Sequence, residues 1–214
     1  MDTFDLYKDI QCRTNGEIYL GVVGPVRSGK STFIKRFMDV LVLPKMTDEH
    51  AKERTVDELP QSASGKSIMT TEPKFVPKEA AEIQLAKDVS VLVRLIDCVG
   101  YMVEGAAGHM ENGAERLVKT PWNEKEIPFT KAAEIGTKKV IHDHSTIGIV
   151  VTTDGSIGEL PRNSYRAAEK KTIQELKSIG KPFVVLVNTR KPYSAEAKNV
   201  AEEIQKEYHV TALP

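Results

Sequence analysis

The sequence contains little cysteine, no excess of either charge and no long hydrophobic run. Its two cysteines, Cys12 and Cys98, are too few for a disulfide framework or a cysteine-rich metal site, and they suit a reducing compartment. Thirty basic and thirty acidic side chains give a formal net charge of zero. The chain therefore lacks the basic field that attracts nucleic acid, and we expect no nucleic-acid partner. Balanced charge also leaves little electrostatic resistance to self-association.

The longest hydrophobic runs are only as long as β-strands. Residues 40–43, 147–151 and 183–187 form these runs, which fall far short of the ~20 residues that a membrane-spanning helix needs. The first ten residues, MDTFDLYKDI, carry acidic side chains where a signal peptide has a basic stretch followed by an apolar one. Both observations predict a cytoplasmic protein.

Short apolar runs alternate with amphipathic stretches, which is typical of an α/β protein with a mostly parallel sheet. Continuous apolar runs indicate strands that are covered by helices on both faces. We therefore expect a three-layer α/β fold with one antiparallel hairpin at the edge of the sheet. The expected strands cover residues 18–23, 82–85, 89–97, 147–152 and 183–188, and the expected helices cover 30–42, 130–142, a stretch capped by Asn163 that stops at Gly180, and 194–208.

Two long polar segments interrupt this alternation, at residues 44–71 and 100–145. Loops of such length inside a domain are usually functional. We expect residues 1–214 to form one domain with a long insertion at about 101–145. Residues 209–214 look like the opening of another strand, so we expect the chain to be a fragment of a longer protein.

Residues 24–31, GPVRSGKS, match the phosphate-binding motif G-x-x-x-x-G-K-[ST] and lie between an expected strand and an expected helix. Gly24 and Gly29 allow a tight turn, so that successive N–H groups converge on the β-phosphate. Lys30 reaches the β- and γ-phosphates, and the Ser31 hydroxyl faces Mg²⁺. Arg27 adds charge at the phosphates unless it lies in solvent. The nucleotide contacts expected here are Gly24, Pro25, Val26, Arg27, Ser28, Gly29, Lys30, Ser31 and Thr32.

A second motif, D-x-x-G, ends the expected strand at residues 89–97. Asp97 is placed to hold Mg²⁺, usually through water, and the Gly100 N–H to approach the γ-phosphate. Between the two motifs, Thr70 or Thr71 is expected to bind Mg²⁺ and to sense the γ-phosphate, although both threonines also suit the start of an edge strand. The expected metal ligands are Ser31, Thr70, Thr71 and Asp97, and the expected catalytic residues are Lys30, Asp97, Thr70 and Thr71.

The order of these elements resembles the GTPase-related (TRAFAC-like) branch of P-loop NTPases, in which a later strand ends in N-K-x-D. Here that motif reads N-T-R-K, so Asn188 is an expected nucleotide contact but Lys191 replaces the aspartate. An ammonium group has donors only and cannot accept the N1 and N2 hydrogens of guanine. Leaving them unpaired costs about 1–3 kcal/mol, which argues against GTP without creating a preference for ATP. Tyr101 replaces the glutamine that orients water in many GTPases, so we expect slow turnover.

Five stretches of the chain carry a more specific resemblance: GVVGPVRSGKSTFIKRFM, DELPQSASGKSIMTTEPKFVP, RLIDCVGY, PWNEKEIPF with AAEIGTKKVI, and HSTIGIVVTTDGSIG. They closely resemble the stage IV sporulation protein A family of spore-coat morphogenetic ATPases, the resemblance covers essentially the whole chain, and the parts outside the general P-loop motifs carry most of its specificity. It implies an N-terminal ATPase domain, with ATP and Mg²⁺ as ligands, and hydrolysis that drives self-assembly of the coat's basement layer around the forespore, in the mother-cell cytoplasm. It also implies a small amphipathic forespore-membrane peptide and other coat or cortex proteins as partners, bound largely through an absent C-terminal region.

Two other functions stay open on the residues alone. One is a regulatory GTPase of the ribosome-assembly type, against which Lys191 and the balanced charge count. The other is a structural building block that binds nucleotide and scarcely turns it over, which Tyr101 keeps open. The sequence leaves undecided the polymer interfaces, the timing of hydrolysis relative to assembly and the oligomeric state.

Overall fold

The computed structural model describes residues 16–46, 48–60, 72–86, 89–111 and 113–214. It contains a six-stranded sheet with the order β10-β9-β8-β1-β3-β2, in which only β2 runs antiparallel to its neighbour. The fold class expected from the sequence is thereby confirmed. The main strands are β1 (Glu17–Val23), β2 (Lys74–Ala86), β3 (Val89–Asp97), β8 (Ile147–Thr153), β9 (Phe183–Asn188) and β10 (Ala212–Leu213), and the helices are α2 (Lys30–Phe37), α3 (Glu49–Glu58), α4 (Phe129–Lys139), α5 (Arg162–Ser178) and α6 (Ala195–Tyr208).

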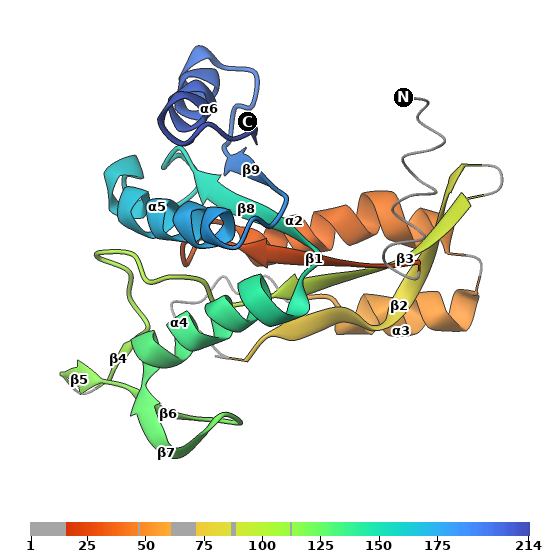
Figure 1. Ribbon diagram of the computed structural model, residues 1–214, viewed down its shortest axis with the longest axis horizontal. Helices are drawn as coiled ribbons and strands as arrows, with labels where there is room; N and C mark the ends of the chain where they lie inside the picture. The colour runs from red at the N-terminus through yellow and green to blue at the C-terminus, as the bar shows by residue number, and fades with distance from the viewer. Residues whose placement is uncertain (1–15, 47, 61–71, 87–88, 112) are drawn as a thin grey trace.

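Alternating side chains of the central strands enter two separate hydrophobic clusters. On β1, Val22 belongs to a cluster with residues of α2 and β2, whereas Val23 belongs to a cluster with residues of α4, α5 and α6. On β8, Ile149 and Val150 divide in the same way. Helices therefore cover both faces of the sheet, with α4 and α5 in front of it and α2 behind it in Figure 1. This arrangement explains why the strands are continuously hydrophobic.

The first helix differs from its expected course. The α-helix ends at Phe37 and continues as a π-helical turn, Met38–Val42, followed by a 3₁₀ turn, Leu43–Lys45. The wider π turn rotates the inward face, so that Met38 and Val42 are buried while Val40 and Leu41 are 58% and 43% exposed. The apolar spacing of residues 30–42 predicts a helix with Val40 and Leu41 on its inward face, and this prediction was wrong.

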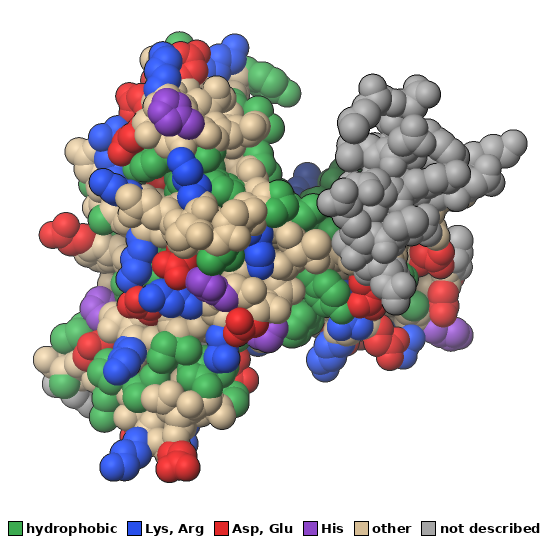
Figure 2. Space-filling view, viewed as in Figure 1, with side chains coloured by type: hydrophobic (Ala, Val, Ile, Leu, Met, Phe, Trp, Pro, Cys, Tyr) green, Lys and Arg blue, Asp and Glu red, His purple; other side chains and the backbone are tan. Residues whose placement is uncertain are grey.

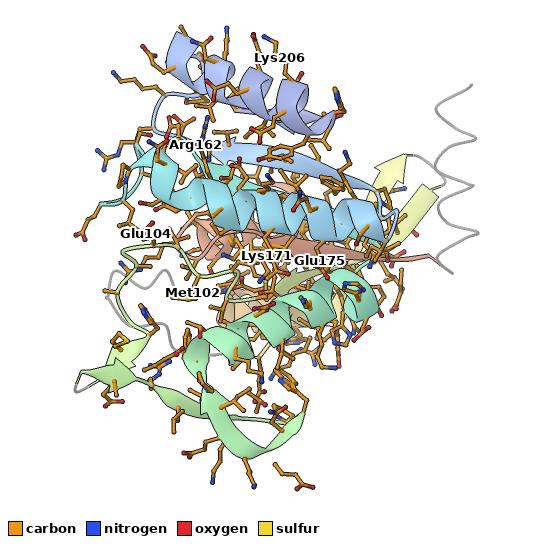
Figure 3. The ribbon with its side chains drawn as sticks, turned by 60° about the vertical axis from the view of Figure 1, so that its left-hand side comes forward. Met102, Glu104, Arg162, Lys171, Glu175 and Lys206 are labelled. Carbon is orange, nitrogen blue, oxygen red and sulfur yellow. The ribbon has the colours of Figure 1, made fainter. Side chains whose placement is uncertain are left out.

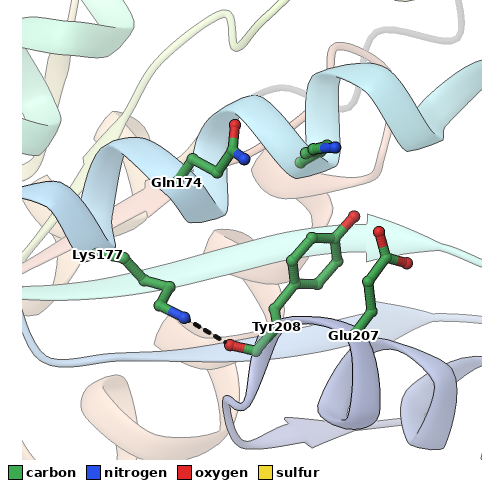
Figure 4. A pocket seen from close by; sticks show the side chains of 5 residues that line it. Gln174, Lys177, Glu207 and Tyr208 are labelled. Atoms are coloured by element: carbon green, nitrogen blue, oxygen red, sulfur yellow. Dashed lines mark hydrogen bonds between the residues drawn. The ribbon is translucent and has the colours of Figure 1, made fainter.

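The two helices after β8 begin differently. Pro161 precedes α5, and among the described residues no side chain caps that helix, so the predicted Asn163 cap was wrong. Ser194 caps α6, because its hydroxyl accepts a hydrogen bond from the Ala197 N–H. At the other end of α6, the Lys177 ammonium donates to the Tyr208 carbonyl at 2.7 Å and so satisfies a terminal backbone acceptor (Figure 4).

Both long polar segments contain regular structure that the sequence did not predict. The first includes α3, whose only buried residue is Thr55. The second forms two small hairpins that project beyond the end of α4 (Figure 1). Phe129 begins α4 and is fully buried, with the Arg116 guanidinium 4.5 Å from its ring centre, so it anchors the insertion. The hairpin strands are β4 (Met110–Glu111), β5 (Ala114–Glu115), β6 (Leu117–Thr120) and β7 (Asn123–Pro128).

Candidate nucleotide-binding site

The phosphate-binding loop connects the end of β1 to the first residue of α2. Gly24 and Gly29 adopt φ angles of 133° and 93°, which favour glycine, and Arg27 also has a positive φ of 60°. A side chain at Gly24 would meet the Val151 carbonyl at 2.4 Å, so the loop lies directly against β8. These angles turn the loop back toward α2, whose N-terminal N–H groups can bind an anion.

The loop is fastened to the segment that follows β3. The Val26 N–H donates to the Tyr101 carbonyl at 2.8 Å, and the Tyr101 N–H donates to the Gly24 carbonyl at 3.2 Å. The guanidinium of Arg27 donates to the Ala107 carbonyl at 3.2 Å. The two sequence motifs, which lie about seventy residues apart in the chain, are thus held together by backbone hydrogen bonds.

Lys30 places a desolvated cation inside the phosphate-binding loop. Its side chain is only 4% exposed, and its ammonium donates to the Pro25 carbonyl at 2.6 Å, across the loop. Burial lowers the pKa of Lys30, while the neighbouring Cys98 and Asp97 act in the opposite direction. An incoming phosphate would supply the negative charge that this buried ammonium favours.

Ser31 and Asp97 face each other beside Lys30. The Ser31 hydroxyl donates to Asp97 Oδ2 at 2.8 Å, whereas the buried Oδ1 has no hydrogen-bond partner among the described residues. Burial raises the pKa of Asp97, against the hydrogen bond from Ser31 and the charge of Lys30. A hydroxyl, a carboxylate with a free oxygen and a nearby phosphate are the oxygen ligands that Mg²⁺ prefers. The residues therefore fit a magnesium ion.

Gly100 lies where a side chain would collide with the loop. Its φ is 94°, and a Cβ there would lie 2.1 Å from the Gly24 carbonyl and 2.6 Å from the Lys30 ammonium. The backbone of Gly100 thus passes close beside the group that is expected to contact the γ-phosphate. The carbonyl belongs to backbone that cannot move freely, so this position requires glycine.

Alanine at Gly100 is expected to lower nucleotide hydrolysis at least about tenfold, since it forces Lys30 or the loop out of place. Gly180→Ala is the matched control, because Gly180 also has a positive φ, 65°, but a Cβ there meets no described atom within 4 Å. Phosphate release and thermal unfolding of both variants separate the effect of the collision from that of backbone strain. Equal losses of activity in the two variants would contradict this prediction.

The expected base-binding segment lies next to the loop. The Asn188 side-chain amide donates to the Ser28 carbonyl at 3.1 Å, so this residue links the end of β9 to the phosphate-binding loop. Lys191 is exposed. Among the described residues no carboxylate from the 188–191 segment stands where guanine would need an acceptor.

The Tyr101 ring is buried and lies against the Lys171 side chain of α5. The tyrosine side chain is only 3% exposed and its hydroxyl is buried, without a hydrogen-bond partner among the described residues. The Lys171 ammonium lies 4.7 Å from the ring centre and pairs with Glu134 on α4 at 2.9 Å. Lys171 projects from α5 toward α4 in Figure 3. The tyrosine therefore packs between two helices and cannot orient water at the γ-phosphate.

Thr70 and Thr71 lie outside the described residues. Thr32 is exposed on the first turn of α2.

Sequence reasoning missed a buried ion pair near this end of the sheet. Arg162, the first residue of α5, pairs with Glu169 through two hydrogen bonds of 2.6 and 2.8 Å (Figure 3 labels Arg162). Glu169 is 1% exposed and also accepts from the Thr152 hydroxyl at 2.6 Å. The pair thereby holds the start of α5 to the end of β8. The spacing of seven places Arg162 and Glu169 on one face of α5, but the sequence does not show that this face packs against Thr152 on β8.

Comparison with known proteins places the whole chain in one family. The family model described as "Stage IV sporulation protein A, ATPase domain" matches residues 1–214. Stage IV sporulation protein A of Clostridioides difficile is 57% identical over 210 residues, or 98% of this chain. The protein of the same name from Bacillus subtilis is 52% identical over 213 residues, or 100% of this chain. The chain spans 43% of the length of either relative.

Among solved structures, a dimerization-deficient mutant of Toc33 from Arabidopsis thaliana aligns with a TM-score of 0.48 and 9% sequence identity. The alignment covers 98% of this chain and 74% of that chain. The fold assignment rests on the sheet order described above.

Proposed function

Because the chain belongs to the stage IV sporulation protein A family, as its ATPase domain, we propose that it binds ATP with Mg²⁺ and hydrolyses it to ADP and phosphate. The observation that carries this proposal is the convergence of Lys30, Ser31 and Asp97 at the start of α2, with the Gly100 backbone beside them. This arrangement provides the cation, the magnesium ligands and the N–H donors that phosphoryl transfer requires.

The residues act mainly by positioning and by charge. The loop N–H groups and the N-terminus of α2 hold the β-phosphate, and Lys30 neutralises charge that develops on the transferred group. Ser31 and Asp97 would hold Mg²⁺, which supplies Lewis-acid charge when it is bound. Tyr101 takes no part in orienting water, so that role falls to backbone groups, to Thr70 or Thr71, or to another molecule. We expect slow turnover for this reason.

ATP is expected to be the better substrate. The family membership supports ATP, and with Lys191 in place of the aspartate the N1 and N2 donors of guanine lose their acceptor, so kcat/KM for GTP should be lower than that for ATP. Paired titrations with the two nucleotides under identical magnesium concentrations measure this ratio. A kcat/KM for GTP equal to or above that for ATP would favour the alternative, a regulatory GTPase.

We further propose that ATP turnover drives self-assembly of a layer at the forespore surface, in the mother-cell cytoplasm. The family membership supports this proposal, and so does the insertion that projects from the body in Figure 1. Acidic and basic side chains are interspersed over the face seen in Figure 2. This mixture of charges does not oppose contact between copies of the chain, and we propose that it does not favour binding of nucleic acid. Turnover per molecule that stays constant as protein concentration rises would contradict coupling between hydrolysis and assembly.

Contacts with a small amphipathic membrane peptide and with other coat or cortex proteins are part of the same proposal, through regions beyond this chain. Among the described residues, no helix combines the length and the hydrophobicity that a bilayer crossing requires. A peripheral attachment through partners is consistent with that finding.

A further inference from the structure

The loops that follow β8 and β9 are joined by a network of hydrogen bonds centred on Asp154 and Thr189. The Thr189 hydroxyl donates to Asp154 Oδ2 at 2.5 Å, and the Ser156 N–H donates to Asp154 Oδ1 at 2.8 Å. Thr189 Oγ1 in turn accepts from the Lys191 N–H at 3.1 Å, and Ser156 Oγ accepts from the Arg190 N–H at 3.0 Å. Both carboxylate oxygens of Asp154 are therefore engaged within the protein.

This network lies at the carboxyl ends of β8 and β9, where we expect the base to bind. Parallel α/β sheets bind ligands outside the carboxyl ends of their strands, and Thr153 and Asn188 are register partners at those ends of β8 and β9. The magnesium ligand Asp97 comes from β3, on the opposite side of β1. With the triphosphate fixed at the start of α2, the rest of the nucleotide extends away from β3, over the ends of β8 and β9.

The network also reaches the phosphate-binding loop without belonging to it. Asn188, which precedes Thr189, donates to the Ser28 carbonyl, and Ile157 lies 3.6 Å from the position that a Cβ of Gly29 would take. Burial alone would raise the pKa of Asp154, but the hydrogen bonds from Ser156 and Thr189 lower it. A charged acceptor makes the bond from Thr189 stronger than a bond between neutral groups.

We propose that the Asp154–Thr189 hydrogen bond determines base specificity by positioning the 189–193 loop. Resting on the proposed ATPase function, this inference assigns Asp154 and Thr189 as positioning residues for the base and not for the phosphates. Each oxygen of Asp154 accepts one hydrogen bond within the protein, from Thr189 or from Ser156, and these bonds hold the shape of the loop. The base would meet a loop of this shape in place of the missing carboxylate at position 191.

The test compares Thr189→Val, which keeps the shape but removes the hydroxyl, with Thr189→Ser, which keeps the hydroxyl. Equilibrium affinities are measured with Mg²⁺ for ADP, for GDP and for inorganic tripolyphosphate, which has no base. Thr189→Val is expected to weaken ADP binding about tenfold, as for the loss of a hydrogen bond to a charged group. Tripolyphosphate affinity should stay within about twofold of wild type. Thr189→Ser should restore most of the ADP affinity, and the preference for ADP over GDP should shrink in Thr189→Val only.

Two results would overturn the inference. The first is ADP affinity in Thr189→Val equal to that of wild type, and the second is an equal loss of ADP and tripolyphosphate affinity, which would indicate damage to the phosphate-binding loop. Asp154→Asn provides a second variant, expected to weaken ADP binding with the same sparing of tripolyphosphate. A wild-type protein that binds none of the three probes would instead overturn the proposed function, and this inference with it.

Discussion

Alanine in place of Lys30 is expected to slow phosphate release from ATP about 100- to 1,000-fold, the loss typical when one preorganised donor to a transition state is removed. The ammonium lies inside the phosphate-binding loop, 2.6 Å from the Pro25 carbonyl and shielded from water. In such surroundings its charge acts on the phosphoryl oxygens with little screening. Single-turnover phosphate release measures the loss directly, and thermal unfolding shows whether the fold persists.

Lys35 provides the matched control, because it is exposed on the same helix. Lys35→Ala should hydrolyse ATP at the wild-type rate. If wild type, Lys30→Ala and Asp97→Ala all released phosphate at one background rate, hydrolysis by this site would be contradicted. That result would favour the structural building block, which binds nucleotide and scarcely turns it over.

Alanine in place of Arg162 is expected to lower the free energy of unfolding by about 3–5 kcal/mol, because it leaves the Glu169 carboxylate buried without a counter-charge. Glu169 is 1% exposed, and after the substitution it keeps the hydrogen bond from Thr152. For a chain of this size the midpoint of thermal unfolding should fall by roughly 6–20 °C. Urea unfolding followed by circular dichroism measures the change.

Arg166 supplies a control on the same helix, one turn further on. It pairs with Glu203 at 2.7 Å, but the two side chains are 51% and 55% exposed. Exposed pairs contribute about 0–1 kcal/mol, so Arg166→Ala should be nearly neutral. A double variant that replaces both Arg162 and Glu169 by apolar residues should recover much of the lost stability. Similar losses for Arg162→Ala and Arg166→Ala would show that burial does not govern this ion pair.

The sheet was predictable because its strands are buried on both faces and read as continuous hydrophobic runs. The hairpin of β2 with β3 was expected only at residues 82–85, whereas β2 begins at Lys74. The helix α3 was missed because its residues form no apolar face, with Thr55 alone buried. Hydrophobic periodicity therefore locates elements that pack on the sheet and overlooks those that cover an edge.

The site was predictable where the chemistry requires particular residues at fixed spacing. The motif residues Lys30, Ser31, Asp97 and Gly100 do come together in the structure. The spacing carried no information on where Tyr101 points, because the direction of one side chain depends on the helices packed around it. Likewise Asp154 followed by Gly155 is the pattern of a turn at the carboxyl end of a strand, and the sequence does not show that Asp154 is hydrogen-bonded to Thr189, 35 residues away.

The hydrogen bond from Asn188 to Ser28 joins residues 160 positions apart, and this separation affects the order in which parts of the domain fold. Contacts between such distant residues form late, since the intervening chain must first be ordered. During synthesis the phosphate-binding loop leaves the ribosome well before β8 and β9, which pack against it. We therefore expect a nascent chain to acquire nucleotide affinity only after β9 has been made, so that bound nucleotide would stabilise the folded domain and not its partly made forms.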